Sequence, residues 1–145
     1  MRCVLIGAML FWSVPVRAEL RPLFDSIREV ESGGNRHAVG DGGRSLGPYQ
    51  IQRSYWRDAG VPGRYAQVRD PAYAERVMIA YWKRYCPESL AKRDYKTLAR
   101  VHNGGASGAR KAATLHYWRK VNKELRERQS GPTAAKSVRR TRSTG

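Results

Sequence analysis

The chain has 145 residues, enough for one domain, and its 28 Lys and Arg residues against 12 Asp and Glu give a net charge of +16. A charge of that size predicts an anionic partner. The chain has two cysteines, Cys3 and Cys86, which excludes a disulfide-rich scaffold and metal sites built from cysteine clusters.

Residues 1–18 have the pattern of a secretory signal peptide. Arg2 supplies a positive start, an uncharged and mostly apolar run extends over residues 4–14, and Val16-Arg17-Ala18 forms a small-x-small cleavage site. The apolar run is too short to cross a membrane as a helix. The alternative is an N-terminal anchor that is never cut. We expect a secreted or periplasmic protein that loses Cys3 with its leader.

Residues 19–128 are predicted to form one mainly helical domain. Apolar side chains recur at helical spacing over residues 20–32, and Gly33-Gly34 ends that helix. Residues 35–51 are rich in glycine and predict a turn region with a small hairpin. Residues 54–59 predict a helical turn, which Gly60 closes.

Three more helices are predicted after this region. Asp70-Pro71 begins the first, with aspartate as the N-cap and proline in the first turn, and Pro87 ends it. Asp94 caps a short helix that runs through Val101, after which residues 102–105 form a polar loop. The last helix spans residues 110–128, and its predicted buried face consists of Leu115, Trp118, Val121 and Leu125.

Residues 129–145 are predicted to be a basic, disordered tail. Lysine and arginine alternate there with Ser, Thr, Ala and Gly, a composition that cannot bury a core. Either the tail binds an anionic cell wall or makes weak contact with anionic membranes, or it is a solvated segment without a role. No nucleic-acid partner is expected, because the basic residues are scattered and the leader directs the chain outward. The sequence leaves the oligomeric state open.

Glu31 is the first candidate catalytic residue. It lies at the C-terminal end of a predicted helix, where the helix dipole favours the neutral form of a carboxyl group. A protonated acid is what a leaving glycosidic oxygen needs. The glycines that follow allow a substrate to approach closely. The alternative is a solvated glutamate at a helix end.

Asp41 is the second candidate, in the turn Val39-Gly40-Asp41-Gly42-Gly43. Backbone N–H groups in such a turn can keep a carboxylate ionised, so that it stabilises or captures an oxocarbenium-like centre. The alternative is an ordinary Asp-Gly turn.

Two further segments are predicted to bind substrate. Residues 47–51 predict a strand that lines a cleft, where Tyr49 could stack on a sugar and Gln50 could hydrogen-bond one; a core strand is the alternative. In the loop after Val101, Asn103 could bind an N-acetyl group or simply cap the helix. The predicted substrate-binding residues are Ser45, Tyr49, Gln50, His102, Asn103 and Gly104. No metal and no cofactor is expected.

Five segments resemble motifs of the invertebrate-type lysozymes, also called the destabilase group. They occur in the order of that family and at nearly its spacing, over about residues 24–122. The segments are Glu31-Ser32-Gly33-Gly34, Gly47-Pro48-Tyr49-Gln50-Ile51, and residues 55–60, 102–105 and 114–121. The first also resembles a segment of soluble lytic transglycosylases and goose-type lysozymes, which share the lysozyme-like fold.

The resemblance implies a mainly α, lysozyme-like α+β fold, in which a small glycine-rich hairpin region lines a cleft. It also implies hydrolysis of the β-1,4 bond between N-acetylmuramic acid and N-acetylglucosamine in peptidoglycan. Glu31 falls at the catalytic acid of the family. Asp41 falls near its second carboxylate, although the intervening loop is shorter here.

The chain departs from the family pattern in its cysteines. Leu46, Ala59 and Ala109 stand where the family usually has cysteines, as expected of a disulfide-poor, bacterial branch. The family's proposed isopeptidase activity uses a serine and a lysine near the Gly-Pro-Tyr-Gln-Ile motif. Ser45 is present but Gln52 occupies the lysine position, and His102 alone is insufficient, so we do not expect that activity.

Three hypotheses about function follow. The first is a hydrolase that uses both carboxylates. The second is a lytic transglycosylase, which needs only Glu31 because the 6-hydroxyl of the substrate attacks and a 1,6-anhydro product forms. The third is a non-catalytic module that binds the cell wall or acts on membranes, in which Glu31 is dispensable.

Overall fold

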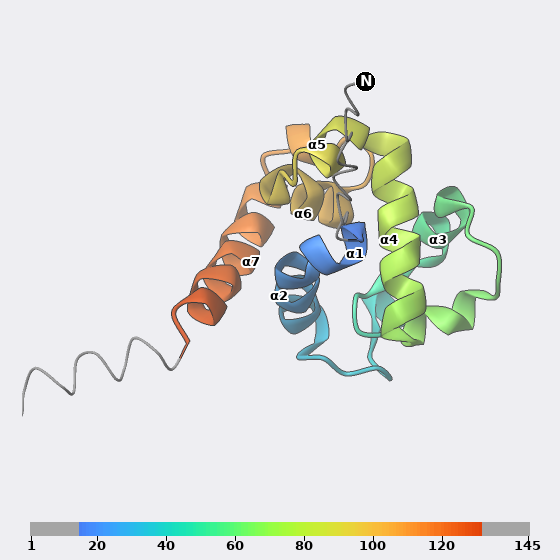
Figure 1. Ribbon diagram of the computed structural model, residues 1–145. Coiled ribbons are helices and arrows are strands. Elements are labelled where there is room, and N and C mark those ends of the chain that lie inside the picture. Colours follow the sequence, from blue (N-terminus) through green and yellow to red (C-terminus); the bar gives the residue numbers. More distant parts are fainter. Residues whose placement is uncertain (1–14, 132–145) are drawn as a thin grey trace, which may run out of the picture.

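The computed structural model describes residues 15–131, and its helices surround one core (Figure 1). Most of the predicted signal peptide and most of the predicted tail lie outside the described residues. The elements are α1 (Val16–Glu19), α2 (Arg21–Ser32), β1 (Val39–Gly40), η1 (Asp41–Gly43), β2 (Ser45–Leu46), β3 (Ile51–Gln52), α3 (Arg53–Ala59), η2 (Tyr65–Arg69), α4 (Pro71–Tyr85), α5 (Pro87–Ala91), α6 (Tyr95–Gly104), η3 (Gly108–Arg110) and α7 (Thr114–Gln129).

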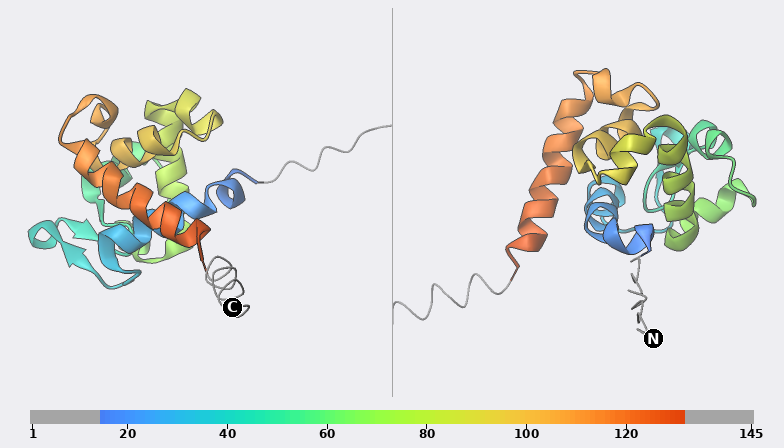
Figure 2. Two further views of the ribbon diagram at one scale, coloured as in Figure 1. Left: turned by 90° about the vertical axis from the view of Figure 1, so that its left-hand side faces the viewer. Right: turned by 45° about the horizontal axis from the view of Figure 1, so that its top comes forward.

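The longer helices form two packed groups. Helix α7 packs against α2 and α6, whereas α3 and η2 pack against α4. Figure 2 shows α7 and α4 along opposite sides of the molecule, with α2 between them. The core therefore lies between α2, α4 and α6, and the mainly helical prediction is confirmed.

Local signals set several helix ends as predicted. The Asp70 side chain accepts a hydrogen bond from the backbone N–H of Tyr73 at 2.8 Å, and that of Asp94 accepts one from Thr97 at 3.1 Å. Gly33 and Gly60 end α2 and α3 in the left-handed conformation, with φ of 59° and 65°.

Two local predictions are wrong and one is incomplete. Pro87 ends α4 as predicted, since α4 stops at Tyr85, but it also begins α5, where its fixed φ suits the first turn. Residues 102–104 are the last turn of α6 rather than a loop, and Gly105 is the C-cap. Residues 47–50 form a turn between β2 and β3 rather than a strand.

The buried face of α7 is also rotated from the predicted one. Val121 and Leu125 are buried as expected, but Leu115 and Trp118 are half-buried. Thr114 and Tyr117 take the innermost positions instead. Tyr117 therefore points toward α2, which matters for the site described below.

The glycine-rich region forms a small antiparallel sheet in the order β1-β2-β3. Each strand has only two residues, so other contacts must hold it in place. The Tyr65 hydroxyl of η2 donates to the carbonyl of Ile51 at 2.7 Å and also lies 3.0 Å from that of Arg44. A Cβ atom on Gly47 would lie 2.5 Å from the carbonyl oxygen of Val68, so this turn touches the backbone of η2 directly.

A buried carboxylate ties the core to the N-terminal helices. Glu75 of α4 is fully buried and accepts hydrogen bonds from Tyr49, from Arg17 and twice from Arg21. Burial raises the pKa of Glu75, but these hydrogen bonds, led by those of Arg21, outweigh burial and hold it below its usual value. Phe24 stacks on Trp82 and meets the edge of Tyr49, completing the core around this ion pair.

The predicted leader boundary, between Ala18 and Glu19, lies inside α1. Cleavage there would remove the hydrogen bond of Arg17 to Glu75 and the packing of Val16 against the core, while Arg21 would still pair with Glu75. The backbone carbonyl of Glu19 accepts a hydrogen bond from Tyr95 at 2.9 Å. Over residues 15–131, no helix has the length and apolar character needed to cross a membrane.

Cys86 lies at the joint between α4 and α5 and is half-buried. Burial raises the pKa of its thiol to about 11, with a smaller contribution from Asp94. A thiol with such a raised pKa forms little thiolate, so Cys86 is not an activated cysteine.

Candidate active site

One cleft of about 440 Å³ contains nearly all of the predicted site residues. The last turns of α2 and α6 form one wall, and η1, β2 and β3 form the other, with α3 between them. The lining residues are Glu31, Asp41, Ser45, Gln50, Ile51, Gln52, Ser54, Tyr55, Asp58, Tyr81, His102, Asn103, Gly104, Gly105 and Lys111.

Glu31 lies on the helical wall, in the last turn of α2. Its side chain is 18 % exposed, and its Oε1 atom accepts a hydrogen bond from the Tyr117 hydroxyl at 2.8 Å. Burial, together with the neighbouring Glu31 carboxylate, raises the pKa of Tyr117 far above its usual value, so this hydroxyl stays a donor. Tyr117 was not predicted as a site residue, since it is 86 positions away in the chain.

His102 lies directly behind Glu31. Its Nε2 atom is 3.6 Å from Glu31 Oε1 and 3.1 Å from the carbonyl oxygen of Tyr49, while its Nδ1 atom is 3.4 Å from the Tyr55 hydroxyl. A carbonyl only accepts, so Nε2 carries the proton, and the hydroxyl can donate to Nδ1. His102 is thus a largely buried support for Glu31, and it also lines the cleft.

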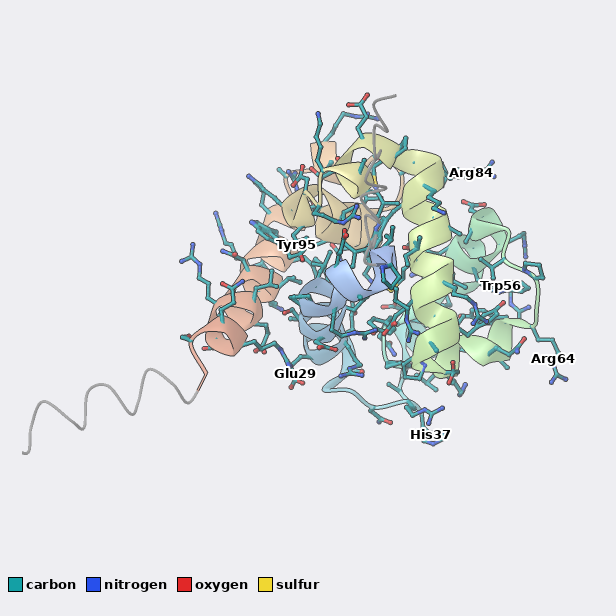
Figure 3. All side chains as sticks on the ribbon, viewed as in Figure 1. Glu29, His37, Trp56, Arg64, Arg84 and Tyr95 are labelled. Atoms are coloured by element: carbon teal, nitrogen blue, oxygen red, sulfur yellow. The ribbon has the colours of Figure 1, made fainter. Side chains whose placement is uncertain are left out.

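The other two histidines lie elsewhere. His37 extends from the exposed loop after α2, away from the body of the molecule (Figure 3), and His116 is exposed on α7. Within residues 15–131, no group of three or more His, Cys, Asp or Glu side chains could hold a metal ion.

Asp41 lies on the sheet wall, in η1, and is exposed. Its carboxylate accepts hydrogen bonds from the Ser45 hydroxyl and from the Gln52 amide, the latter at 3.2 Å. These two bonds, and the nearby positive charge of Arg44, hold the pKa of Asp41 below its usual value. The donors are side chains, not the backbone N–H groups that the turn had suggested.

Ser45 and Gln50 have structural partners of their own. Ser45 is 1 % exposed and uses its hydroxyl on Asp41. The Gln50 amide nitrogen donates to the carbonyl of Gly47 at 2.9 Å. A Cβ atom added to Gly40 would lie 2.1 Å from the amide oxygen of Gln50. A side chain at position 40 would therefore force the Gln50 amide to shift.

Tyr49 is the site residue that the structure contradicts. Its side chain is fully buried, so it cannot stack on a sugar, and its hydroxyl donates to Glu75 at 2.7 Å. Its contribution comes through the backbone, because its carbonyl fixes the His102 ring. The core alternative is thus the right one for this residue.

Asn103 and Gly104 line the cleft from the end of α6. Asn103 is exposed and available to a ligand. Gly104 is required for packing, since a Cβ there would lie 2.6 Å from Cγ2 of Thr114. Its carbonyl accepts a hydrogen bond from Lys111 at 2.6 Å, which places an exposed ammonium group at the rim.

The cleft thus holds two carboxyl groups in contrasting surroundings. Glu31 is mostly buried among neutral donors, whereas Asp41 is exposed and stabilised as an anion. That contrast suits one group to giving up a proton and the other to remaining charged. Asp58 of α3 is a third carboxylate in the lining and accepts a hydrogen bond from Tyr85 at 3.3 Å.

Comparison with known proteins identifies relatives. The family model described as Destabilase matches residues 23–124. The lysozyme of Magallana gigas is 40% identical over 82 residues, which are 55% of this chain and 60% of that protein. An invertebrate-type lysozyme of Ruditapes philippinarum is 32% identical over 66% of this chain and 74% of its own length.

Solved structures agree with this assignment. The Meretrix lusoria lysozyme, solved in complex with Aeromonas hydrophila PliI, is 31% identical with a TM-score of 0.61, over 71% of this chain and 88% of that one. Tapes japonica lysozyme is 30% identical with a TM-score of 0.60, over 70% and 86%. With the family model matching most of its length, the chain belongs to the destabilase family and has the lysozyme-like fold.

Proposed function

We propose that the protein is a secreted muramidase, which hydrolyses the β-1,4 bond between N-acetylmuramic acid and N-acetylglucosamine in peptidoglycan. The observation that carries this proposal is that Glu31 and Asp41 both line one cleft. The relatives named lysozymes support the same reaction class.

Glu31 acts as the general acid in this mechanism. It gives its proton to the glycosidic oxygen as the bond to the anomeric carbon breaks. Asp41 stabilises or captures the anomeric carbon. Water then adds its hydroxyl to that carbon and returns a proton to Glu31. Tyr117 and His102 hold the Glu31 side chain from behind, so that it is positioned before substrate arrives.

The net charge of +16 concentrates the enzyme on an anionic wall. This attraction is long-ranged and is screened by salt, since the Debye length is about 8 Å at physiological ionic strength. We expect binding to whole walls to weaken steeply as salt rises.

Mass spectrometry of the fragments released from purified peptidoglycan tests the proposal. Wild type should release fragments with reducing ends. Glu31→Gln should lower the rate by about 10³-fold, because a general acid contributes about 10²–10⁴. Glu29→Gln is the matched control, because Glu29 lies on the same helix, is exposed and does not line the cleft.

The second carboxylate is tested separately with Asp41→Asn and Asp58→Asn. The proposal expects a large loss in the first variant and a small one in the second. The opposite result would move the second role to Asp58. Anhydro ends, with only the Glu31 variant inactive, would identify a lytic transglycosylase. No release by wild type across pH and salt would leave a wall-binding module.

A further inference from the structure

A second, smaller pocket of about 330 Å³ adjoins the cleft. It shares Gln52 and Ser54 with the cleft, so it opens from the cleft where β3 passes into α3. Its lining consists of Gly43, Arg44, Gln52, Arg53, Ser54 and Tyr65. Two of these residues are arginines and none is acidic.

Both arginines are exposed but held in place. The Arg53 guanidinium lies over the Tyr65 ring, 4.7 Å from its centroid. Tyr65 is itself buried and fixed by its hydroxyl, which donates to the carbonyl of Ile51. Arg44 is anchored through Nε, which donates to the backbone carbonyl of Asp41 at 2.9 Å. The pocket is thus partly organised before any ligand binds.

Within residues 15–131, neither guanidinium group forms a salt bridge with a carboxylate, although the charge of Arg44 lies close enough to Asp41 to lower its pKa. A planar guanidinium binds a carboxylate through two parallel hydrogen bonds. A basic pocket of this kind, beside a cleft that holds a glycan, suits an anionic group on the same glycan.

We propose that the Arg44–Arg53 pocket is a subsite for a carboxylate of the peptide that peptidoglycan carries on its muramic acid residues. The inference rests on the proposed function for the position of the glycan. It adds a preference to that function: strands with free peptide carboxylates bind more tightly than strands whose carboxylates are blocked.

Soluble, uncross-linked peptidoglycan strands free of phosphate polymers provide the test. One sample keeps its peptide carboxylates, and in the other they are converted to primary amides. For wild type, amidation should raise KM about two- to fivefold with little change in kcat, as for one exposed ion pair. Arg53→Gln should show the raised KM on free strands and respond little to amidation.

Arg57→Gln is the matched control. Arg57 is exposed on the same helix, α3, and lines neither pocket, so this variant loses the same charge elsewhere. It should behave like wild type. An equal rise in KM in Arg53→Gln and Arg57→Gln would mean that only the overall charge of the protein matters, and it would overturn the proposal. So would an unchanged KM of wild type on amidated strands.

A third sample, strands that carry phosphate polymers, separates the two sources of an anion. An effect of Arg53 that is seen only there would overturn the assignment to a carboxylate. If wild type cleaves no strand, calorimetric binding to the same samples still decides the matter. An Arg53-dependent preference for free carboxylates would support the subsite while the muramidase proposal fails, and equal binding would refute the subsite as well.

Discussion

The two walls of the cleft each present a carboxylate but are built by different means. On the helical wall, Glu31 is packed among side chains from α6 and α7, and its position depends on the core. On the sheet wall, Asp41 stands exposed between strands of two residues each, and its position depends on polar contacts.

The difference shows that one site can combine two kinds of preorganisation. Packing shields most of the carboxyl that gives up a proton in the proposed mechanism. Hydrogen bonds keep the other carboxyl charged while leaving it in contact with solvent. The two walls should therefore respond differently to mutation. The position of Glu31 should be lost only when the whole domain is destabilised, whereas the position of Asp41 should be sensitive to local substitutions in the sheet.

Gly47→Ala should break the sheet wall and has the largest expected effect. Gly47 has a φ of 77°, and the new Cβ would meet the backbone carbonyl of Val68 at 2.5 Å, which cannot move aside cheaply. We expect a loss of about 3 kcal/mol in the free energy of unfolding, measured by urea denaturation.

Gly43→Ala is its control, since φ there is 93° but no atom lies within 4 Å of the added Cβ. It should cost about 1 kcal/mol, from backbone strain alone. Equal losses in the two variants would show that the contact with η2 does not hold the turn.

Glu75→Gln should weaken the support that the two walls share, because Tyr49 links Glu75 to the ring of His102. The folded pKa of Glu75 lies below its ordinary value of 4.5. Its charge therefore stabilises the fold above the unfolded pKa, and this contribution is lost as pH falls through the lower folded pKa.

At pH 7 the free energy of unfolding of Glu75→Gln should be about 2 kcal/mol lower than that of wild type. The substitution breaks a buried ion pair, but the amide oxygen can still accept a hydrogen bond. Urea denaturation at a series of pH values should show this gap to wild type narrowing in acid. A gap that stays constant with pH would contradict the role of the charge.

Ser45→Ala should have the smallest effect and act on the sheet wall alone. It removes one of the two hydrogen bonds that hold the pKa of Asp41 down, so that this pKa rises. If Asp41 must be ionised, activity on the acid side falls at a higher pH, by about half a unit to one unit. The pH–rate profile of kcat/KM measures the shift.

Ser54→Ala provides the comparison, because Ser54 also lines the cleft but is not among the groups that lower the pKa of Asp41. If the acid side of the pH–rate profile of Ser45→Ala is identical to that of wild type, either Gln52 alone is enough to lower the pKa of Asp41 or Asp41 does not titrate in the reaction.

Much of the fold follows from local signals in the sequence. The Asp70-Pro71 start of α4 and the Gly33 end of α2 each depend on a few adjacent residues, and both were predicted correctly. The glycines after Asn103 misled the prediction for α6, because packing against Thr114 accommodates Gly104 inside the helix.

The support of the site could not be predicted in the same way. Tyr117 meets Glu31 across 86 positions, and Glu75 meets Tyr49 across 26. No periodicity links such pairs, and the aromatic side chain of Tyr49 suits a sugar platform as well as a core. Glu31 and Asp41 could be proposed as candidates from the sequence because each lies within its own glycine-rich motif.

Because Cys86 lies at the joint between α4 and α5, the opening of this joint can be measured directly. With a pKa of about 11, its thiol holds on the order of one thiolate in a thousand at pH 8, and it is half-buried as well. Alkylation of the native protein should therefore be slow and should accelerate when the joint opens. Labelling rates over a range of denaturant concentrations would report the free energy of that opening without adding any probe to the chain.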